Sequence, residues 1–196
     1  QYLRYAVKTH HPLYFNQLWS GLDPASVIAE LVMSITNTSG YTYEVAPLAT
    51  LIELRLIEMM CKQYGYSSGD GIFTTGGSHA NLLSVQLALN HKADFKNQGM
   101  HAFDKTPVIL VSEEAHYSFD KAAMVSGIRK SNVVKVKVNA KGQIDPDALE
   151  SSIHSLKKEN KLPVMLASTA GTTLSGSFDD LHKLSVICKQ NQCPSF

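Results

Sequence analysis

The apolar positions in the first third of the chain recur every three to four residues, which predicts amphipathic helices. One helix is expected over 23–35, because Asp23-Pro24 combines a capping aspartate with a proline in the first turn. A second is expected over about 47–64. Between them, 41–46 has the composition of a short extended segment, and 1–22 shows no clean period and is expected to be irregular.

From residue 72 onward, short apolar runs alternate with helical patterns. The continuous runs 107–112 and 164–168 predict buried parallel strands, and the alternating run 133–138 predicts a half-exposed one. A short β-prone run at 72–74 precedes them. Helices are expected from Ser78, over 119–127, over 145–159 and from Asp179-Asp180 onward. This alternation predicts an α/β fold with a mostly parallel sheet and right-handed crossovers.

Three polar clusters follow strands of the expected sheet. They are Gly76-Gly77-Ser78, His116-Tyr117-Ser118 and Gly171-Thr172-Thr173. In open parallel sheets, ligands bind beyond the carboxyl ends of the strands. The three clusters therefore predict one shared site.

The first cluster has the chemistry of an anion site. Glycine allows a tight turn and a close approach of the backbone, and a helix start offers free N–H groups and a partial positive charge. Ser78 either caps the helix or donates its hydroxyl to the same anion. A phosphate fits here, and a plain tight turn between strand and helix explains two glycines and a serine as well. The Walker A lysine and the third glycine of the Rossmann fingerprint are missing.

Composition narrows the class of protein. With 196 residues, of which 44% are hydrophobic and 18% charged, the chain is long enough for one sizeable core. A net charge of +1 gives no support for nucleic-acid binding. Three cysteines without a Cys-x-x-Cys pair argue against a disulfide framework and favour a cytoplasmic location. No signal peptide or long apolar span indicates a membrane partner, and the histidine spacing indicates no metal site.

A family resemblance runs along essentially the whole chain. It is carried by 11–24, 41–47, 69–73 leading into 76–78, 114–118, and 170–173 with 176–179. These stretches resemble the group II pyridoxal-phosphate-dependent amino acid decarboxylases, in the branch of the glutamate, cysteine sulfinate and aspartate enzymes. The resemblance is specific for the family and much less so for the substrate.

This resemblance implies a fold type I architecture, a transferase-like large α/β domain around a mixed seven-stranded sheet, which binds pyridoxal 5'-phosphate. Gly77 and Ser78 match the phosphate-binding turn of the family. His116 matches the catalytic histidine that stacks on the pyridine ring, and Thr172 matches a threonine that lines the cofactor. From the residues alone, His116 is equally a core or helix-capping histidine, and Thr172 a residue that satisfies backbone groups at the strand end.

The resemblance also implies a substrate and a partner. Gln17 matches a glutamine that contacts the side-chain carboxylate of the substrate, and Ser20 lies where the family places a residue near cofactor and substrate. Gln17 alone could simply satisfy backbone groups. The expected substrate is a small acidic amino acid: glutamate, aspartate or cysteine sulfinate. A homodimer is expected, with 1–46 as a substrate and dimer segment and 47–196 as the first part of the large domain.

Two family groups are missing from the sequence: the aspartate that pairs with the pyridine nitrogen and the lysine that forms the Schiff base. Lys121, Lys130 and Lys183 lie in no matching context. We therefore expect an N-terminal portion, truncated before the Schiff-base lysine and the small C-terminal domain, and inactive on its own. The alternative is a non-catalytic remnant that acts as a dimerisation or binding partner. Another fold type I enzyme, such as an aminotransferase or sulfur-removing lyase, would not explain 15–18 and 42–45.

Overall fold

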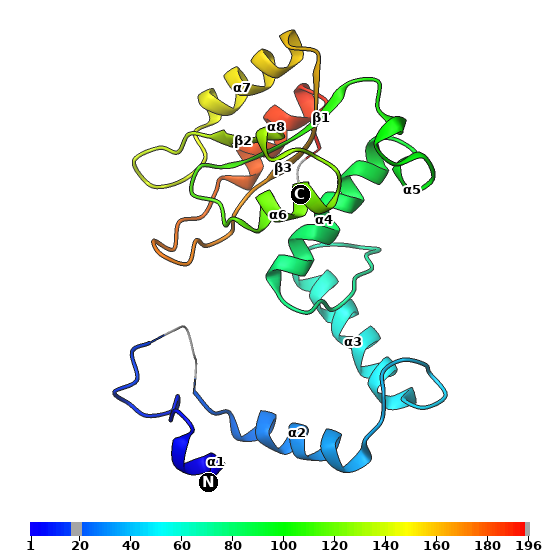
Figure 1. Cartoon of the computed structure of the whole chain (residues 1–196), viewed down its shortest axis with the longest axis vertical. Coiled ribbons are helices and arrows are strands. Elements are labelled where there is room, and N and C mark those ends of the chain that lie inside the picture. The colour runs from blue at the N-terminus through cyan, green and yellow to red at the C-terminus, as the bar shows by residue number, and fades with distance from the viewer. Residues whose placement is uncertain (17–20, 195–196) are drawn as a thin grey trace. The chain divides into compact units, whose positions relative to one another are not determined.

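The computed structural model describes residues 1–16 and 21–194 (Figure 1). Its contacts divide the chain into two compact units, Gln1–Phe73 and Thr74–Phe196. None of the described helices combines the length and the apolar character that a membrane crossing requires. The expected boundary after residue 46 lies inside the first unit and stays a prediction.

The first unit consists of three helices. They are α1 (Tyr2–Tyr5), α2 (Pro24–Thr36) and α3 (Pro47–Gln63). The Asp23 carboxylate caps α2 by accepting the Ser26 N–H at 2.8 Å, as the Asp-Pro pair predicts. The extended segment expected at 41–46 is wrong, because these residues form turns in which the Ala46 N–H donates to the Thr42 carbonyl at 3.2 Å.

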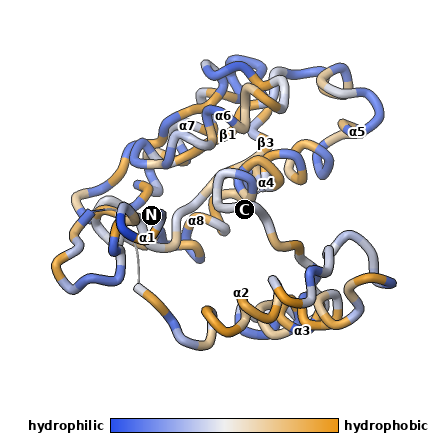
Figure 2. Tube along the Cα trace, turned by 60° about the horizontal axis from the view of Figure 1, so that its bottom comes forward, coloured by the Kyte–Doolittle hydropathy of each residue, from blue (hydrophilic) through white to orange (hydrophobic). Residues whose placement is uncertain are grey.

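The apolar side chains of the first unit are mostly exposed. Ala46 is the one buried residue among those that the structure describes in this unit. Figure 2 shows hydrophobic positions along α2 and α3. On α2 the exposed large apolar side chains are Val27, Ile28, Leu31, Val32, Met33 and Ile35. The amphipathic pattern predicts these two helices correctly, but their apolar side chains are not buried within the unit.

The second unit is an α/β layer structure. Its elements are α4 (Gly77–Lys92), α5 (Phe95–Gln98), η1 (Gly99–Ala102), β1 (Thr106–Ser112), α6 (Ser118–Val125), η2 (Lys130–Asn132), β2 (Val133–Val136), α7 (Pro146–Lys158), β3 (Lys161–Ala167) and α8 (Leu181–Gln190). The described strands form one sheet in the order β2-β1-β3, and both pairings are parallel. The expected α/β fold with a parallel sheet is confirmed.

The core of this unit lies on both faces of the sheet. Ile109 and Val111 of β1 pack in one cluster with buried residues of α4 and α6. Val108 and Leu110 pack in the other cluster, with buried residues of α7 and α8. Successive side chains of a strand point to opposite faces, so a strand covered on both sides must be apolar throughout. This is why β1 appears in the sequence as a continuous apolar run.

The prediction of a strand at 72–74 is wrong. These residues have no regular secondary structure, and Ile72 and Phe73 are exposed. A β-prone composition becomes a strand only when a neighbouring strand supplies hydrogen-bond partners. At the outer side of β3, the Leu166 N–H instead donates to the Pro194 carbonyl at 2.9 Å.

The three cysteines are free thiols with different surroundings. Cys188 and Cys193 are buried, whereas Cys61 is half-buried. A hydrogen bond with Cys188, together with burial, raises the pKa of the Cys193 thiol. The same hydrogen bond lowers the pKa of the Cys188 thiol, so burial and not the pKa must protect that residue. We expect an aromatic disulfide reagent at neutral pH to modify one thiol in the native chain and three after denaturation, because the reagent reaches Cys61 and not the two buried thiols. Cys61→Ser should remove the native reaction, and two rapid native equivalents would contradict this expectation.

Candidate active site

The turn before α4 has a backbone that only glycine adopts readily. Gly76 is the N-cap, with φ 97° and ψ 166°. Its carbonyl accepts the N–H groups of His79 and Ala80, at 3.1 and 3.2 Å. Among the described residues, the N–H groups of Gly77 and Ser78 have no hydrogen-bond partner. The prediction that the Ser78 side chain caps the helix is wrong, because Gly76 holds that position and Ser78 is exposed.

This turn fits a phosphate group. A methyl group added at Gly76 or Gly77 would meet no other heavy atom within 4 Å, so the backbone is open to a ligand. The free N–H groups lie at the start of a 16-residue helix, where the partial positive charge favours an anion. The exposed hydroxyl of Ser78 adds a third donor to the two N–H groups.

His116 follows β1 and precedes α6, with an exposed ring. Its Nδ1 accepts the Ser118 N–H at 3.2 Å, which satisfies one free donor of the α6 N-terminus. This contact resembles the capping role that the sequence leaves open, although the N-cap residue of α6 is Tyr117. It does not compete with a stacking role, because capping uses the edge of the ring and stacking uses its face.

A buried polar pair links the phosphate turn to His116. Asn81 lies one turn into α4 from Gly77, and its Nδ2 donates to Ser118 Oγ at 2.8 Å. The same hydroxyl lies 2.8 Å from His116 Nδ1. The helix that follows the first predicted cluster is thus hydrogen-bonded to the second cluster. Sequence reasoning gave Asn81 no role, although an amide among the apolar positions of α4 is a signal for a buried polar contact.

Thr172 follows β3, at the same edge of the sheet as His116. Its hydroxyl lies 2.7 Å from Ser175 Oγ and accepts the Ser177 N–H at 3.0 Å. The Thr172 N–H in turn donates to the Ser177 carbonyl at 2.9 Å. The side chain thus shapes its own loop, as the backbone-satisfying interpretation predicts, and its role in lining a cofactor stays a prediction.

Two predicted site residues have no described position. Gln17 and Ser20 lie outside the described residues. Over residues 1–16 and 21–194, no three potential metal ligands gather in one place. The Lys121 amine lies over the Tyr117 ring, 4.5 Å from its centroid, and Lys130 pairs with Asp120 at 3.6 Å.

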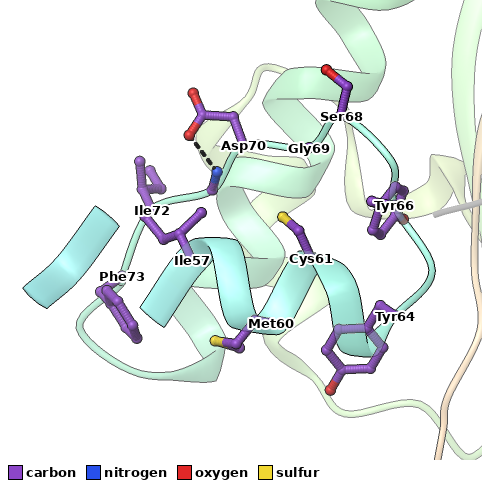
Figure 3. A pocket seen from close by; sticks show the side chains of 11 residues that line it. Ile57, Met60, Cys61, Tyr64, Tyr66, Ser68, Gly69, Asp70, Ile72 and Phe73 are labelled. Atoms are coloured by element: carbon purple, nitrogen blue, oxygen red, sulfur yellow. Dashed lines mark hydrogen bonds between the residues drawn. The ribbon is translucent and has the colours of Figure 1, made fainter. Parts of the chain in front are cut away.

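A hollow of about 490 Å³ lies in the first unit, between the end of α3 and residues 66–73 (Figure 3). Its lining is mostly apolar and aromatic and includes Ile57, Met60, Cys61, Tyr64 and Phe73. The Asp70 carboxylate at its rim accepts the Gly71 N–H at 2.7 Å. A polar hollow of about 470 Å³ lies at the opposite ends of the strands, beside Thr106, Asn132 and Lys161. Neither hollow contains a predicted site residue among those that the structure describes, and a site at the carboxyl edge of the sheet stays a prediction.

Comparison with known proteins identifies the family. The model of the pyridoxal-dependent decarboxylase conserved domain matches residues 1–194. The chain belongs to this family. The family resemblance of the sequence is therefore confirmed.

Two curated decarboxylases show how the chain relates to the family. The acidic amino acid decarboxylase GADL1 of Xenopus tropicalis is 40% identical over 191 residues, 97% of this chain and 37% of the relative. The human cysteine sulfinic acid decarboxylase is 38% identical over 190 residues, 96% of this chain and 38% of the relative. The chain thus spans less than two fifths of the length of these relatives.

Solved decarboxylase structures confirm the fold. The crystal structure of mouse CSAD matches with a TM-score of 0.93 at 36% identity, over 97% of this chain and 41% of that one. Rice TDC, solved with PLP and tryptamine, is 19% identical with a TM-score of 0.76, over 88% of this chain and 39% of that one, and supports the fold alone. The fold type I assignment is therefore confirmed.

Proposed function

We infer that the whole protein of which this chain forms part uses pyridoxal 5'-phosphate to remove the α-carboxylate of a small acidic amino acid as carbon dioxide. The observation that carries this proposal is the hydrogen-bonded chain Asn81–Ser118–His116, which links α4, the helix that begins at the Gly77-Ser78 turn, to the ring at the end of β1. Relatives named as acidic amino acid and cysteine sulfinic acid decarboxylases support the substrate class: aspartate, cysteine sulfinate or glutamate.

Each group of the site has one task in this proposal. The N–H groups of Gly77 and Ser78 hold the phosphate, His116 stacks on the pyridine ring, and Thr172 lines the ring from the end of β3. When bound, the cofactor supplies an electron sink for the charge left on the substrate carbon. The lysine that anchors it belongs to a part of the protein outside these 196 residues. The neighbouring lysines fit this view, since Lys121 and Lys130 have other partners.

Substrate recognition falls to Gln17 and Ser20 in this proposal. The amide of Gln17 donates to the side-chain carboxylate of the substrate, and Ser20 contacts cofactor and substrate. A hydrogen bond to a charged group contributes about 1.5–3 kcal/mol, so Gln17→Ala should raise KM for the acidic substrate by about 10- to 150-fold.

A second copy of the protein covers the first unit in this proposal. The apolar side chains along α2 and α3 are exposed, and an exposed apolar surface of this extent marks an interaction site. A homodimer that buries α2 and α3 in its interface would remove these apolar side chains from water. The free cysteines are consistent with a cytoplasmic location.

The deciding experiment measures carbon dioxide release from aspartate, cysteine sulfinate and glutamate by the full-length protein and by the 196-residue chain. We expect turnover of at least one substrate by the full-length protein and none by the 196-residue chain. Gln17→Ala should raise KM, while Gln63→Ala, at the exposed end of α3, should leave KM within twofold. Turnover by the 196-residue chain, or none by the full-length protein with any of the three substrates, would refute the proposal.

A further inference from the structure

One hydrogen-bonded chain in the second unit ends on the imidazole of His116. It runs from Asn81 Nδ2 to Ser118 Oγ over 2.8 Å, and from Ser118 Oγ to His116 Nδ1 over 2.8 Å. Asn81 is half-buried on α4, and Ser118 is the first residue of α6 with only 1% of its surface exposed. The hydroxyl at the centre of this chain is buried, so solvent does not compete for it and both of its hydrogen bonds are strengthened.

The direction of each hydrogen bond determines which ring nitrogen of His116 carries the proton. The Ser118 N–H points at His116 Nδ1 from 3.2 Å, and a backbone N–H only donates, so Nδ1 is an acceptor and carries no hydrogen. The amide of Asn81 donates to the Ser118 hydroxyl, which leaves the hydroxyl proton free to donate to the same Nδ1. A neutral imidazole whose Nδ1 accepts two hydrogen bonds carries its proton on Nε2.

We propose that Asn81 and Ser118 are positioning residues that hold His116 as the Nε2–H tautomer, in one fixed ring orientation. The proposal rests on the stacking role of His116 given above and deepens it. Because Asn81 lies on the helix whose first residue is Gly77, the chain also sets the ring relative to the phosphate turn. A ring that stacks on a cofactor needs both a fixed plane and a fixed distance from the phosphate.

The same two helices provide a matched control. Gln86 Nε2 of α4 donates to Ser126 Oγ at the end of α6, also over 2.8 Å. Gln86 is half-buried like Asn81, and Ser126 is buried with 5% of its surface exposed. The described structure shows no histidine nitrogen hydrogen-bonded to Ser126. Substitutions in this pair therefore affect the packing of α4 on α6 without affecting the imidazole of His116.

The experiment records the ring nitrogen resonances of the ¹⁵N-histidine-labelled 196-residue chain, with His116 assigned by its loss in His116→Gln. We expect a pyridine-like Nδ1 and a pyrrole-like Nε2. Asn81→Asp replaces the donor by an acceptor, so the serine proton turns away from the ring. Nδ1 then keeps only the Ser118 N–H as a donor, and its resonance should move further from pyrrole-like values, toward those of a pyridine-like nitrogen with fewer hydrogen bonds. Gln86→Glu makes the same change in the control pair and should leave both resonances in place.

A second measurement separates positioning from structure in the full-length enzyme. Ser118→Ala should lower kcat/KM by about 10- to 100-fold, the size of effect that a misplacement of 1 Å can have. Ser118→Thr keeps the hydroxyl and should retain most of the wild-type kcat/KM. Ser126→Ala should leave kcat/KM within twofold of the wild-type value. A pyrrole-like Nδ1 in the wild type, or Nδ1 unchanged in folded Asn81→Asp, would overturn the proposal. Neither result depends on whether the full-length protein is a decarboxylase.

Discussion

Asp179→Ala is expected to lower the free energy of unfolding of the second unit by about 2–5 kcal/mol. The Asp179 carboxylate is buried and accepts the N–H groups of Ile144 and Thr169, each at 2.7 Å. Leaving a buried N–H without an acceptor costs about 1–3 kcal/mol, and alanine leaves two. The two N–H groups come from the approach to α7 and the end of β3, so the carboxylate ties together segments that are distant in sequence.

The measurement is urea denaturation, with the midpoint and its slope read for each variant. Asp179→Asn keeps one oxygen acceptor, so its free energy of unfolding should fall by about half as much as that of Asp179→Ala. The neighbouring Asp180 is exposed and accepts only the Lys183 N–H, at 3.0 Å, as the cap of α8, so Asp180→Ala should cost ~1 kcal/mol. Equal losses for the two alanine variants would show that the buried carboxylate has no special role.

Most elements of the fold could be predicted because their signals are local. The caps of α2, α7 and α8 are the aspartates Asp23, Asp145 and Asp180, each placed just before an apolar periodic pattern. The strands β1 and β3 are continuous apolar runs because helices cover both of their faces. These features depend on a few consecutive residues, so the sequence pattern is sufficient to locate them.

The errors arise where the outcome depends on a distant partner. The run at 72–74 has β-prone residues, but no described strand pairs with it, and it stays irregular. The Asn81–Ser118 bond joins residues 37 apart, and Asp179 reaches Ile144 over 35 residues. A pattern of apolar and polar positions indicates that such a polar residue is buried but does not say which donor or acceptor it meets.

The positions of two of the three predicted clusters could be inferred from the strand pattern. The clusters around His116 and Thr172 follow β1 and β3, and parallel strands bring their carboxyl ends to one edge of a sheet. The Gly76-Gly77-Ser78 turn follows no described strand, and its helix contacts the His116 segment through the Asn81–Ser118 hydrogen bond instead. The capping group at α4 could not be foreseen, since it depends on the backbone of Gly76 rather than on the Ser78 side chain. The Thr172 hydroxyl likewise has its partners within its own loop, at Ser175 and Ser177.

Gly76→Ala is expected to weaken binding of pyridoxal 5'-phosphate to the full-length apoprotein by about 5- to 150-fold. The residue has φ 97° and ψ 166°, a backbone region that is essentially restricted to glycine and costs other residues about 1–3 kcal/mol. A methyl group there meets no atom within 4 Å, so the cost comes from the backbone and not from a clash. The free variant relaxes the turn, and binding must restore it, so the strain appears as lost affinity.

A titration of the apoprotein, followed by absorbance or fluorescence, measures this change. The matched control is Gly99→Ala, because Gly99 also has a positive φ of 57° with an extended ψ of −143° and open space around it. Gly99 is the first residue of η1, directly after α5 and before β1, and so lies away from the carboxyl edge. Both variants should lose similar stability, but only Gly76→Ala should lose affinity. Equal affinities for the two variants would show that the turn before α4 does not hold the phosphate, and the site would then have to be sought elsewhere along the same edge.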